Sequence, residues 1–273
     1  MVEVDWVEEK LDSIRKGIKS DSEIEIIKRW AKDIVKKPVE RVSSGIPGLD
    51  PLMEGGFPKG SHIVLSGYPG TGKSSFGMAF VAEGCRNNEK CLYMTVEQPP
   101  AAIIRQGLQF NYDFPRWEEQ GLLHIAYLDF RKSIETKVFE TIKQTLENGH
   151  YSRWVIDSVN PILETPLPVS YVDWQTHMPS RESFNELIRI NLMILFGIAE
   201  KNGVTTVYIC QRDEKDLTNK LLGYIADGLI TMERKILGNK SSRTTTLEKL
   251  RLTKIDDAPH NAEFTENGLS IID

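Results

Sequence analysis

Residues 62–74 of the sequence read HIVLSGYPGTGKS, an apolar run that passes directly into a glycine-rich segment. The apolar run predicts a buried strand, and the segment from Gly67 to Ser74 matches the pattern Gly-x-x-x-x-Gly-Lys-Ser completely. In this pattern Gly70 and Gly72 let backbone N–H groups turn inward around phosphate oxygens, and the N-terminus of the next helix adds a favourable partial charge. We therefore expect a strand, a phosphate-binding loop and a helix in succession.

The loop predicts a site for ATP and Mg²⁺. Lys73 is expected to reach the β- and γ-phosphates, and Ser74 is expected to offer its hydroxyl to the metal. The residues assigned to the nucleotide are Gly67, Tyr68, Pro69, Gly70, Thr71, Gly72, Lys73, Ser74 and Ser75. A glycine turn that binds nothing is the alternative, and the flanking strand and helix argue against it.

A second buried strand candidate, residues 154–157, ends in a carboxylate about 80 residues after the loop. The carboxyl ends of parallel strands line the ligand crevice of such sheets. Asp157 is therefore expected to bind Mg²⁺ together with Ser74. The alternative role of an aspartate at a strand end is to cap the next helix.

Two further strand candidates end in polar side chains. Residues 91–96 precede Glu97, the candidate general base for the attacking water, although a carboxylate here also suits the N-terminus of the next helix. Residues 204–210 precede Gln211, whose amide is placed to sense the γ-phosphate, with a solvated loop residue as the alternative. Lys73, Glu97 and Gln211 are thus the catalytic candidates near the loop.

Strand and helix candidates alternate up to about residue 226, after which strand follows strand. The other expected elements are strands at 122–127, 229–234, 244–253 and in a last segment to Ile272, and helices near 100–109, 134–148 and 181–201. Alternation predicts an α/β fold with a mostly parallel central sheet flanked by helices, and the final strands predict an antiparallel extension.

The domain organisation follows from a change in character near residue 40, where turn-rich segments begin. We expect an ATPase domain over residues 41–273 and a small helical extension over residues 1–40. In that extension the apolar residues that are spaced to share one helix face are Ile24, Ile27, Ala31 and Ile34.

Composition restricts the function classes and the compartment. The net charge of −5 argues against a general polyanion binder. Cys85, Cys91 and Cys210 have neither metal-type pairing nor the even count of a disulfide framework. The acidic start and the lack of an apolar run near 18 residues argue against a secretory peptide or membrane span. We therefore expect a cytoplasmic protein.

With these residues in place, the chain resembles the KaiC-like ATPases of the RecA superfamily, in a single-domain form, from about Val42 to Ile272. The resemblance rests on residues 41–50, RVSSGIPGLD, on residues 55–60, GGFPKG, and on the loop, Glu97 and Asp157. It implies a RecA-like P-loop core that hydrolyses ATP.

The resemblance also implies assembly. Lys249 and Arg251 match a Lys-x-Arg element that reaches the neighbouring subunit's site in this family, which implies a homo-oligomeric ring, expected to be a hexamer. Two charges on the same face of an exposed strand are the alternative. Gln98 replaces the second glutamate of the family, so slow hydrolysis is expected.

Autokinase activity of the kind known in the clock member of the family is doubtful, because its Ser-Thr acceptor pair corresponds to Gly223 and Tyr224. Ser241, Ser242 and residues 244–246 remain as other acceptors. Residues 161–180 carry aromatic and acidic side chains but no Lys or Arg, which favours partner binding or packing over phosphate contacts and leaves stacking on single-stranded DNA open.

Three functions follow from these observations. The favoured one is an ATP-hydrolysing ring that acts as a nucleotide-driven switch on a protein partner. The second is a recombinase-like ATPase that assists DNA repair. The third is a nearly inactive ATP-binding regulatory module, which Gln98 suggests.

Overall fold

In the computed structural model of this protein, the described residues are 38–129, 137–165, 181–212, 218–237 and 240–272. The chain divides into two compact units, residues 1–40 and 41–273. Of the first unit only residues 38–40 are described, and they are exposed and lie outside helices and strands. The predicted N-terminal helix and most of the aromatic segment 161–180 lie outside the described residues.

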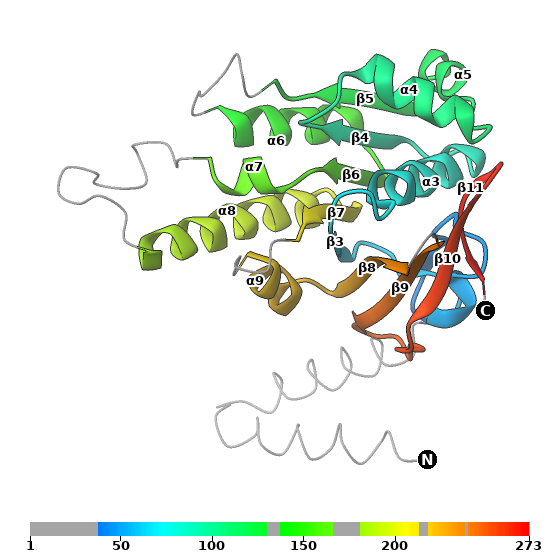
Figure 1. Cartoon of the computed structure of the whole chain (residues 1–273). Coiled ribbons are helices and arrows are strands. Elements are labelled where there is room, and N and C mark those ends of the chain that lie inside the picture. The colour runs from blue at the N-terminus through cyan, green and yellow to red at the C-terminus, as the bar shows by residue number, and fades with distance from the viewer. Residues whose placement is uncertain (1–37, 130–136, 166–180, 213–217, 238–239, 273) are drawn as a thin grey trace, which may run out of the picture. The chain divides into compact units, whose positions relative to one another are not determined.

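The alternating elements of the second unit form a nine-stranded sheet, counted over the described residues (Figure 1). Its order from edge to edge is β11 (Gly268–Ile272), β10 (His260–Thr265), β9 (Lys240–Leu250), β8 (Gly228–Leu237), β3 (His62–Gly67), β7 (Thr205–Gln211), β6 (Arg153–Asp157), β4 (Cys91–Thr95) and β5 (Leu123–Tyr127). The strands from β8 to β5 pair in parallel, and β9, β10 and β11 add on in antiparallel fashion. This confirms the predicted fold class.

Helices cover both faces of the sheet (Figure 1). They are α3 (Lys73–Arg86), α4 (Pro100–Gln109), α5 (Phe114–Glu119), α6 (Val138–Gly149), α7 (Asn160–Leu163), α8 (Arg181–Lys201) and α9 (Thr218–Ile225), with a 3-10 turn at Asp50–Met53. Buried residues of α3, α4 and α5 form one apolar core, and those of α6, α7, α8 and α9 form another. Because successive strand residues point to opposite faces, β6 gives Val155 to the first core and Ile156 to the second.

The helix after the phosphate loop packs unusually close to the sheet. A Cβ placed on Gly77 of α3 would lie 2.9 Å from Cγ1 of Val155 and 3.0 Å from Cδ1 of Ile209. A larger residue would push the helix away from β6 and β7. Gly77 therefore sets the distance between the loop helix and two strands whose ends carry site residues.

Several short elements differ from the sequence-based expectation. The strand expected to run to residue 253 ends at Leu250, whose register partner Gly228 is the first residue of β8. The next turn contains Leu252 in the left-handed region at φ 58°. A small pairing of β1 (Arg41–Val42) with β2 (Phe57–Pro58), as well as α5, α7 and α9, was not predicted.

Candidate nucleotide site

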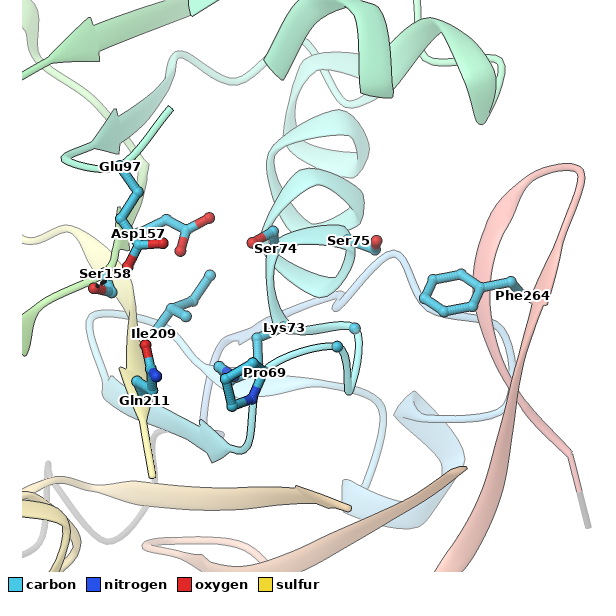
Figure 2. A pocket seen from close by; sticks show the side chains of 12 residues that line it. Pro69, Lys73, Ser74, Ser75, Glu97, Asp157, Ser158, Ile209, Gln211 and Phe264 are labelled. Carbon is cyan, nitrogen blue, oxygen red and sulfur yellow. Dashed lines mark hydrogen bonds between the residues drawn. The ribbon is translucent and has the colours of Figure 1, made fainter. Parts of the chain in front are cut away.

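The parallel strands bring their carboxyl ends to one edge of the sheet, and a cavity of about 340 Å³ opens there (Figure 2). Its volume falls in the range of small-molecule sites. The lining residues are Pro69, Gly70, Gly72, Lys73, Ser74, Ser75, Glu97, Asp157, Ser158, Ile209, Gln211 and Phe264. The predicted loop, metal ligand, general base and sensor thus meet in one place.

The phosphate loop turns through two glycines with positive φ, Gly70 at 79° and Gly72 at 114°. The ammonium of Lys73 donates to the carbonyl oxygens of Gly67 at 2.7 Å and Tyr68 at 2.9 Å. Burial lowers the pKa of Lys73, and the nearby carboxylates oppose that shift. The loop therefore holds a cation at the floor of the cavity.

Three loop residues assigned to the nucleotide do not line the cavity: Gly67, Tyr68 and Thr71. Gly67 is the buried end of β3, and Thr71 is buried with its hydroxyl donating to the carbonyl oxygen of Tyr68 at 2.9 Å. The guanidinium of Arg212 lies over the Tyr68 ring, 5.8 Å from its centroid. These residues shape the loop from outside the cavity.

Asp157 ends β6 and is 7% exposed. The hydroxyl of Tyr93 donates to its Oδ2 at 2.6 Å. Burial raises the pKa of the Asp157 carboxyl, and hydrogen bonds with Tyr93 and Ser74 oppose the shift. A carboxylate and a neighbouring hydroxyl are the oxygen ligands that Mg²⁺ prefers, so the donor set fits the metal.

Glu97 lies beside Asp157 and Ser158 on one side of the cavity (Figure 2). Ser158 donates from its hydroxyl to Oε1 of Glu97 at 2.8 Å. Just before Glu97, the N–H of Val96 donates to the carbonyl oxygen of Asp157 at 2.9 Å. Glu97 is exposed, so water has access to the carboxylate that Ser158 orients.

Gln98, the residue that suggested slow hydrolysis, does not line the cavity. The side-chain amide of Gln106 in α4 donates to Oε1 of Gln98 at 2.6 Å. The hydroxyl of Thr95 also donates to the Gln98 carbonyl oxygen at 3.0 Å. Gln98 thus joins β4 to α4 at this point, and its amide is engaged by the helix.

Gln211 lines the cavity at the end of β7. Its backbone N–H donates to Oδ1 of Asn160 at 2.9 Å, and the Asn160 amide donates back to the Gln211 carbonyl oxygen at 3.4 Å. Asn160 begins α7, directly after the Asp157 strand end. The position of Gln211 is therefore tied to the same strand end that carries the metal ligand candidate.

Lys249 and Arg251 do not line this cavity. The Lys249 ammonium donates to the carbonyl oxygens of Gly223, Tyr224 and Ala226, at 3.2, 3.1 and 2.6 Å, and so caps the C-terminus of α9. Arg251 pairs with Asp227 at 3.2 Å. Arg251 also follows the end of β9 rather than lying on the strand.

Four residues of the site were not predicted from the sequence: Tyr93, Ser158, Ile209 and Phe264. Phe264 comes from β10 and faces the cavity on the side opposite Glu97 (Figure 2). Its ring stacks on Phe110 with centroids 5.9 Å apart. The hydroxyl of Ser158 was detectable, since it directly follows Asp157, whereas Phe264 has no local sequence signal.

The strand order, the loop and the strand-end carboxylates define a P-loop nucleoside triphosphatase fold of the RecA type. The model of the KaiC ATPase family matches residues 42–273, and the chain belongs to that family. This confirms the resemblance drawn from residues 41–50, residues 55–60, the phosphate loop, Glu97 and Asp157.

Three comparisons illustrate the relationship. A UPF0273 protein of Methanopyrus kandleri is 26% identical over 251 residues, which cover 85% of this chain and 92% of that protein. The circadian clock oscillator protein KaiC of Parasynechococcus marenigrum is 25% identical, over 85% of this chain and 43% of its own length. The crystal structure of a KaiC-like protein of Pyrococcus horikoshii matches with a TM-score of 0.71 and 27% identity, covering 86% of this chain and all of that one.

No helix in the described part of the chain has both the length and the apolarity needed to cross a membrane.

Proposed function

We propose that this protein binds Mg-ATP in the cavity at the sheet edge and hydrolyses it. The observation that carries the proposal is the contact between Ser158 and Glu97, which aims a carboxylate into the same cavity as Lys73 and Asp157. Together these residues supply a phosphate-binding cation, a metal ligand and a base.

Each residue has a distinct role in the proposed reaction. The loop N–H groups and Lys73 hold the β- and γ-phosphates, and Ser74 and Asp157 hold the metal. Bound Mg²⁺ supplies neutralisation of the charge on the phosphate oxygens. Glu97 orients the attacking water and accepts its proton, and Gln211 senses the γ-phosphate.

We further propose that the protein works as a ring, expected to be a hexamer, whose nucleotide state changes the surface offered to a protein partner. Tyr224 and Leu252, next to the Lys249 and Arg251 element, are 82% and 75% exposed. Apolar side chains at this level of exposure suit a contact with a second copy of the chain. In such a contact, Arg251 and Lys249 would supply cations to a neighbouring site.

The compartment proposed is the cytoplasm. The three cysteines are free thiols and buried, which agrees with a reducing interior.

The first experiment measures ATP turnover as a function of protein concentration, with and without single-stranded DNA, together with mass by light scattering. We expect the ATP turnover rate to rise as the protein assembles and to be the same with and without single-stranded DNA. Lys73→Ala is the site control, and it should abolish the thermal stabilisation given by ATP and Mg²⁺. An unchanged shift in that variant would refute the site assignment.

The same experiment separates the alternatives. Turnover that requires single-stranded DNA would place the protein with the recombinase-like ATPases. Tight ATP binding with almost no turnover at any concentration would make it a regulatory module.

A further inference from the structure

Two arginines oppose each other on neighbouring strands close to the phosphate loop. Arg234 of β8 is the register partner of Arg243 of β9. Residues directly opposite in an antiparallel pair project from the same face, and like charges in that position are destabilising. Both side chains are guanidinium cations. A local conflict of this kind is expected at functional or strained sites.

The face that carries this pair is the one next to the phosphate loop. A Cβ placed on Gly70 would lie 3.6 Å from Nη1 of Arg234. A Cβ placed on Gly72 would lie 3.3 Å from Cε of Met232, two residues before Arg234 on the same strand. Arg234 therefore reaches the loop itself. Its Nε donates to the hydroxyl of Ser241 at 3.0 Å, which steadies the side chain.

Neither arginine lines the cavity, but the Arg243 side chain lies against a residue that does. Its guanidinium carbon lies 4.9 Å from the centroid of the Phe264 ring, which lines the cavity. Within the part of the chain that the structure describes, Nε of Arg243 is buried and has no hydrogen-bond partner. A buried polar atom without a partner is uncommon and points to a missing ligand or water.

The two ends of the cavity identify the part of a nucleotide that lies near the arginines. Glu97 and Asp157 lie at one end, where the γ-phosphate would be, and Phe264 lies at the other (Figure 2). Arg243, on Phe264, therefore lies on the side away from the γ-phosphate end, and Arg234 lies at the loop beside Gly70. An arginine fork suits phosphate oxygens in this position.

We propose that Arg234 and Arg243 form a second cation site, supplied by the same subunit, for the phosphate chain of the bound nucleotide between its β-phosphate and its sugar. This inference rests on the proposed nucleotide site. Because the α-phosphate, which lies between the β-phosphate and the sugar, takes no part in the bond that breaks, the contact is equally strong before and during the reaction. The arginines therefore act on nucleotide affinity and KM, and leave kcat almost unchanged.

The test measures binding of ADP and of the non-hydrolysable ATP analogue AMP-PNP by calorimetry, with Mg²⁺, to Arg234→Ala and Arg243→Ala. Each variant should raise both dissociation constants roughly tenfold, as expected for loss of a hydrogen bond to a charged group. KM for ATP should rise by a similar factor, with kcat changed less than about twofold.

Lys235→Ala is the matched control. Lys235 carries the same charge, follows Arg234 on β8, and points to the opposite face with 68% of its side chain exposed. It should bind both nucleotides as the wild type does. Arg243→Lys provides a second variant that keeps the charge but removes the fork, and it should recover part of the affinity lost in Arg243→Ala.

The outcomes distinguish this inference from the proposed function. Wild-type affinity in both alanine variants, with binding lost in Lys73→Ala, would overturn the arginine site and leave the nucleotide site intact. Unchanged affinity with a reduced mass in light scattering would also overturn it, because the arginines would then bind an acidic group of a second copy. Wild-type binding in Lys73→Ala would refute the nucleotide site itself.

Discussion

The phenolic hydroxyl of Tyr93 donates a 2.6 Å hydrogen bond to Oδ2 of Asp157, across the two neighbouring strands β4 and β6. Tyr93 is fully buried, and burial raises the pKa of its hydroxyl well above the ordinary value. The hydroxyl therefore stays protonated and acts as a donor at physiological pH. The Tyr93 hydroxyl therefore orients the Asp157 carboxylate, which is our proposed metal ligand.

Tyr93→Phe should weaken the effect of Mg²⁺ on ATP binding. Loss of a partner that orients a metal ligand costs about tenfold or more in metal affinity. The Mg²⁺ concentration that gives half-maximal stabilisation by ATP should rise by about that factor. A thermal-shift titration with Mg²⁺ at fixed ATP measures it.

Tyr208→Phe is the control for Tyr93→Phe. Tyr208 is also fully buried, and its hydroxyl lies 3.1 Å from Nδ1 of His62, away from the cavity. Both variants should lose some stability. If both shift the Mg²⁺ midpoint equally, Tyr93 has only a packing role.

Asp157→Asn should stabilise the nucleotide-free protein while removing its response to Mg²⁺. Burial raises the pKa of Asp157 above 3.8, so the charged carboxylate at neutral pH is a cost to the folded state. Removing it should raise the free energy of unfolding by roughly 1 kcal/mol, the size of other stabilising changes at functional sites. Urea unfolding of both proteins without nucleotide measures the difference.

The sign of the pH dependence follows from linkage. The folded state binds the Asp157 proton more tightly than the unfolded chain does, so the wild type gains stability as pH falls through the raised folded pKa. That gain is complete below the unfolded value of 3.8. The advantage of Asp157→Asn should therefore shrink as pH is lowered, and an advantage independent of pH would contradict this origin.

Glu97→Gln should keep ATP binding and lose turnover by about a hundredfold or more, the usual contribution of a general base. Gln98→Glu is the neighbouring control. Its side chain lies against Gln106 in α4 and not in the cavity, so turnover should change by less than about threefold. Steady-state phosphate release measures both. A large gain in Gln98→Glu would show that the second position does take part in hydrolysis.

The proposed action between subunits is best tested with Arg251. Lys249 caps α9 in its own chain, so its removal would disturb that helix, whereas Arg251 is largely exposed and makes an ion pair with Asp227. Mixing Arg251→Ala with Lys73→Ala subunits should restore turnover to a measurable fraction of the wild-type rate, because some interfaces then hold an intact site. If the mixtures are no more active than either variant alone, Arg251 does not act on a neighbouring site, and its role is the ion pair with Asp227.

The sheet and the central site residues were predictable because the relevant information is local. Each strand from β3 to β7 is a short apolar run, and Asp157 or Gln211 ends such a run directly. Parallel pairing then brings the carboxyl ends of these strands to the same edge of the sheet, and no additional sequence signal is needed to predict this. The loop and the strand ends therefore line one cavity.

Other residues depend on contacts that no local pattern contains. Phe264 reaches the cavity because β10 pairs beyond β9 and its ring stacks on Phe110, about 150 residues earlier in the chain. The end of β9 at Leu250 depends on where β8 begins and on an irregularity between Leu229 and Ile230. The hydrogen bond from Gln106 to Gln98 likewise could not be predicted, because it depends on where α4 packs.

Main-chain atoms set the spacing between the strand ends that carry Glu97 and Asp157. Thr95 is the register partner of Asp157, and the N–H of Val96 donates a 2.9 Å hydrogen bond to the Asp157 carbonyl oxygen. A ladder bond of this kind does not depend on which side chain occupies either position. Core residues around the site can therefore be exchanged over evolutionary time without moving Glu97 relative to Asp157. We therefore expect this spacing to be kept in relatives that share only about a quarter of their residues with this chain.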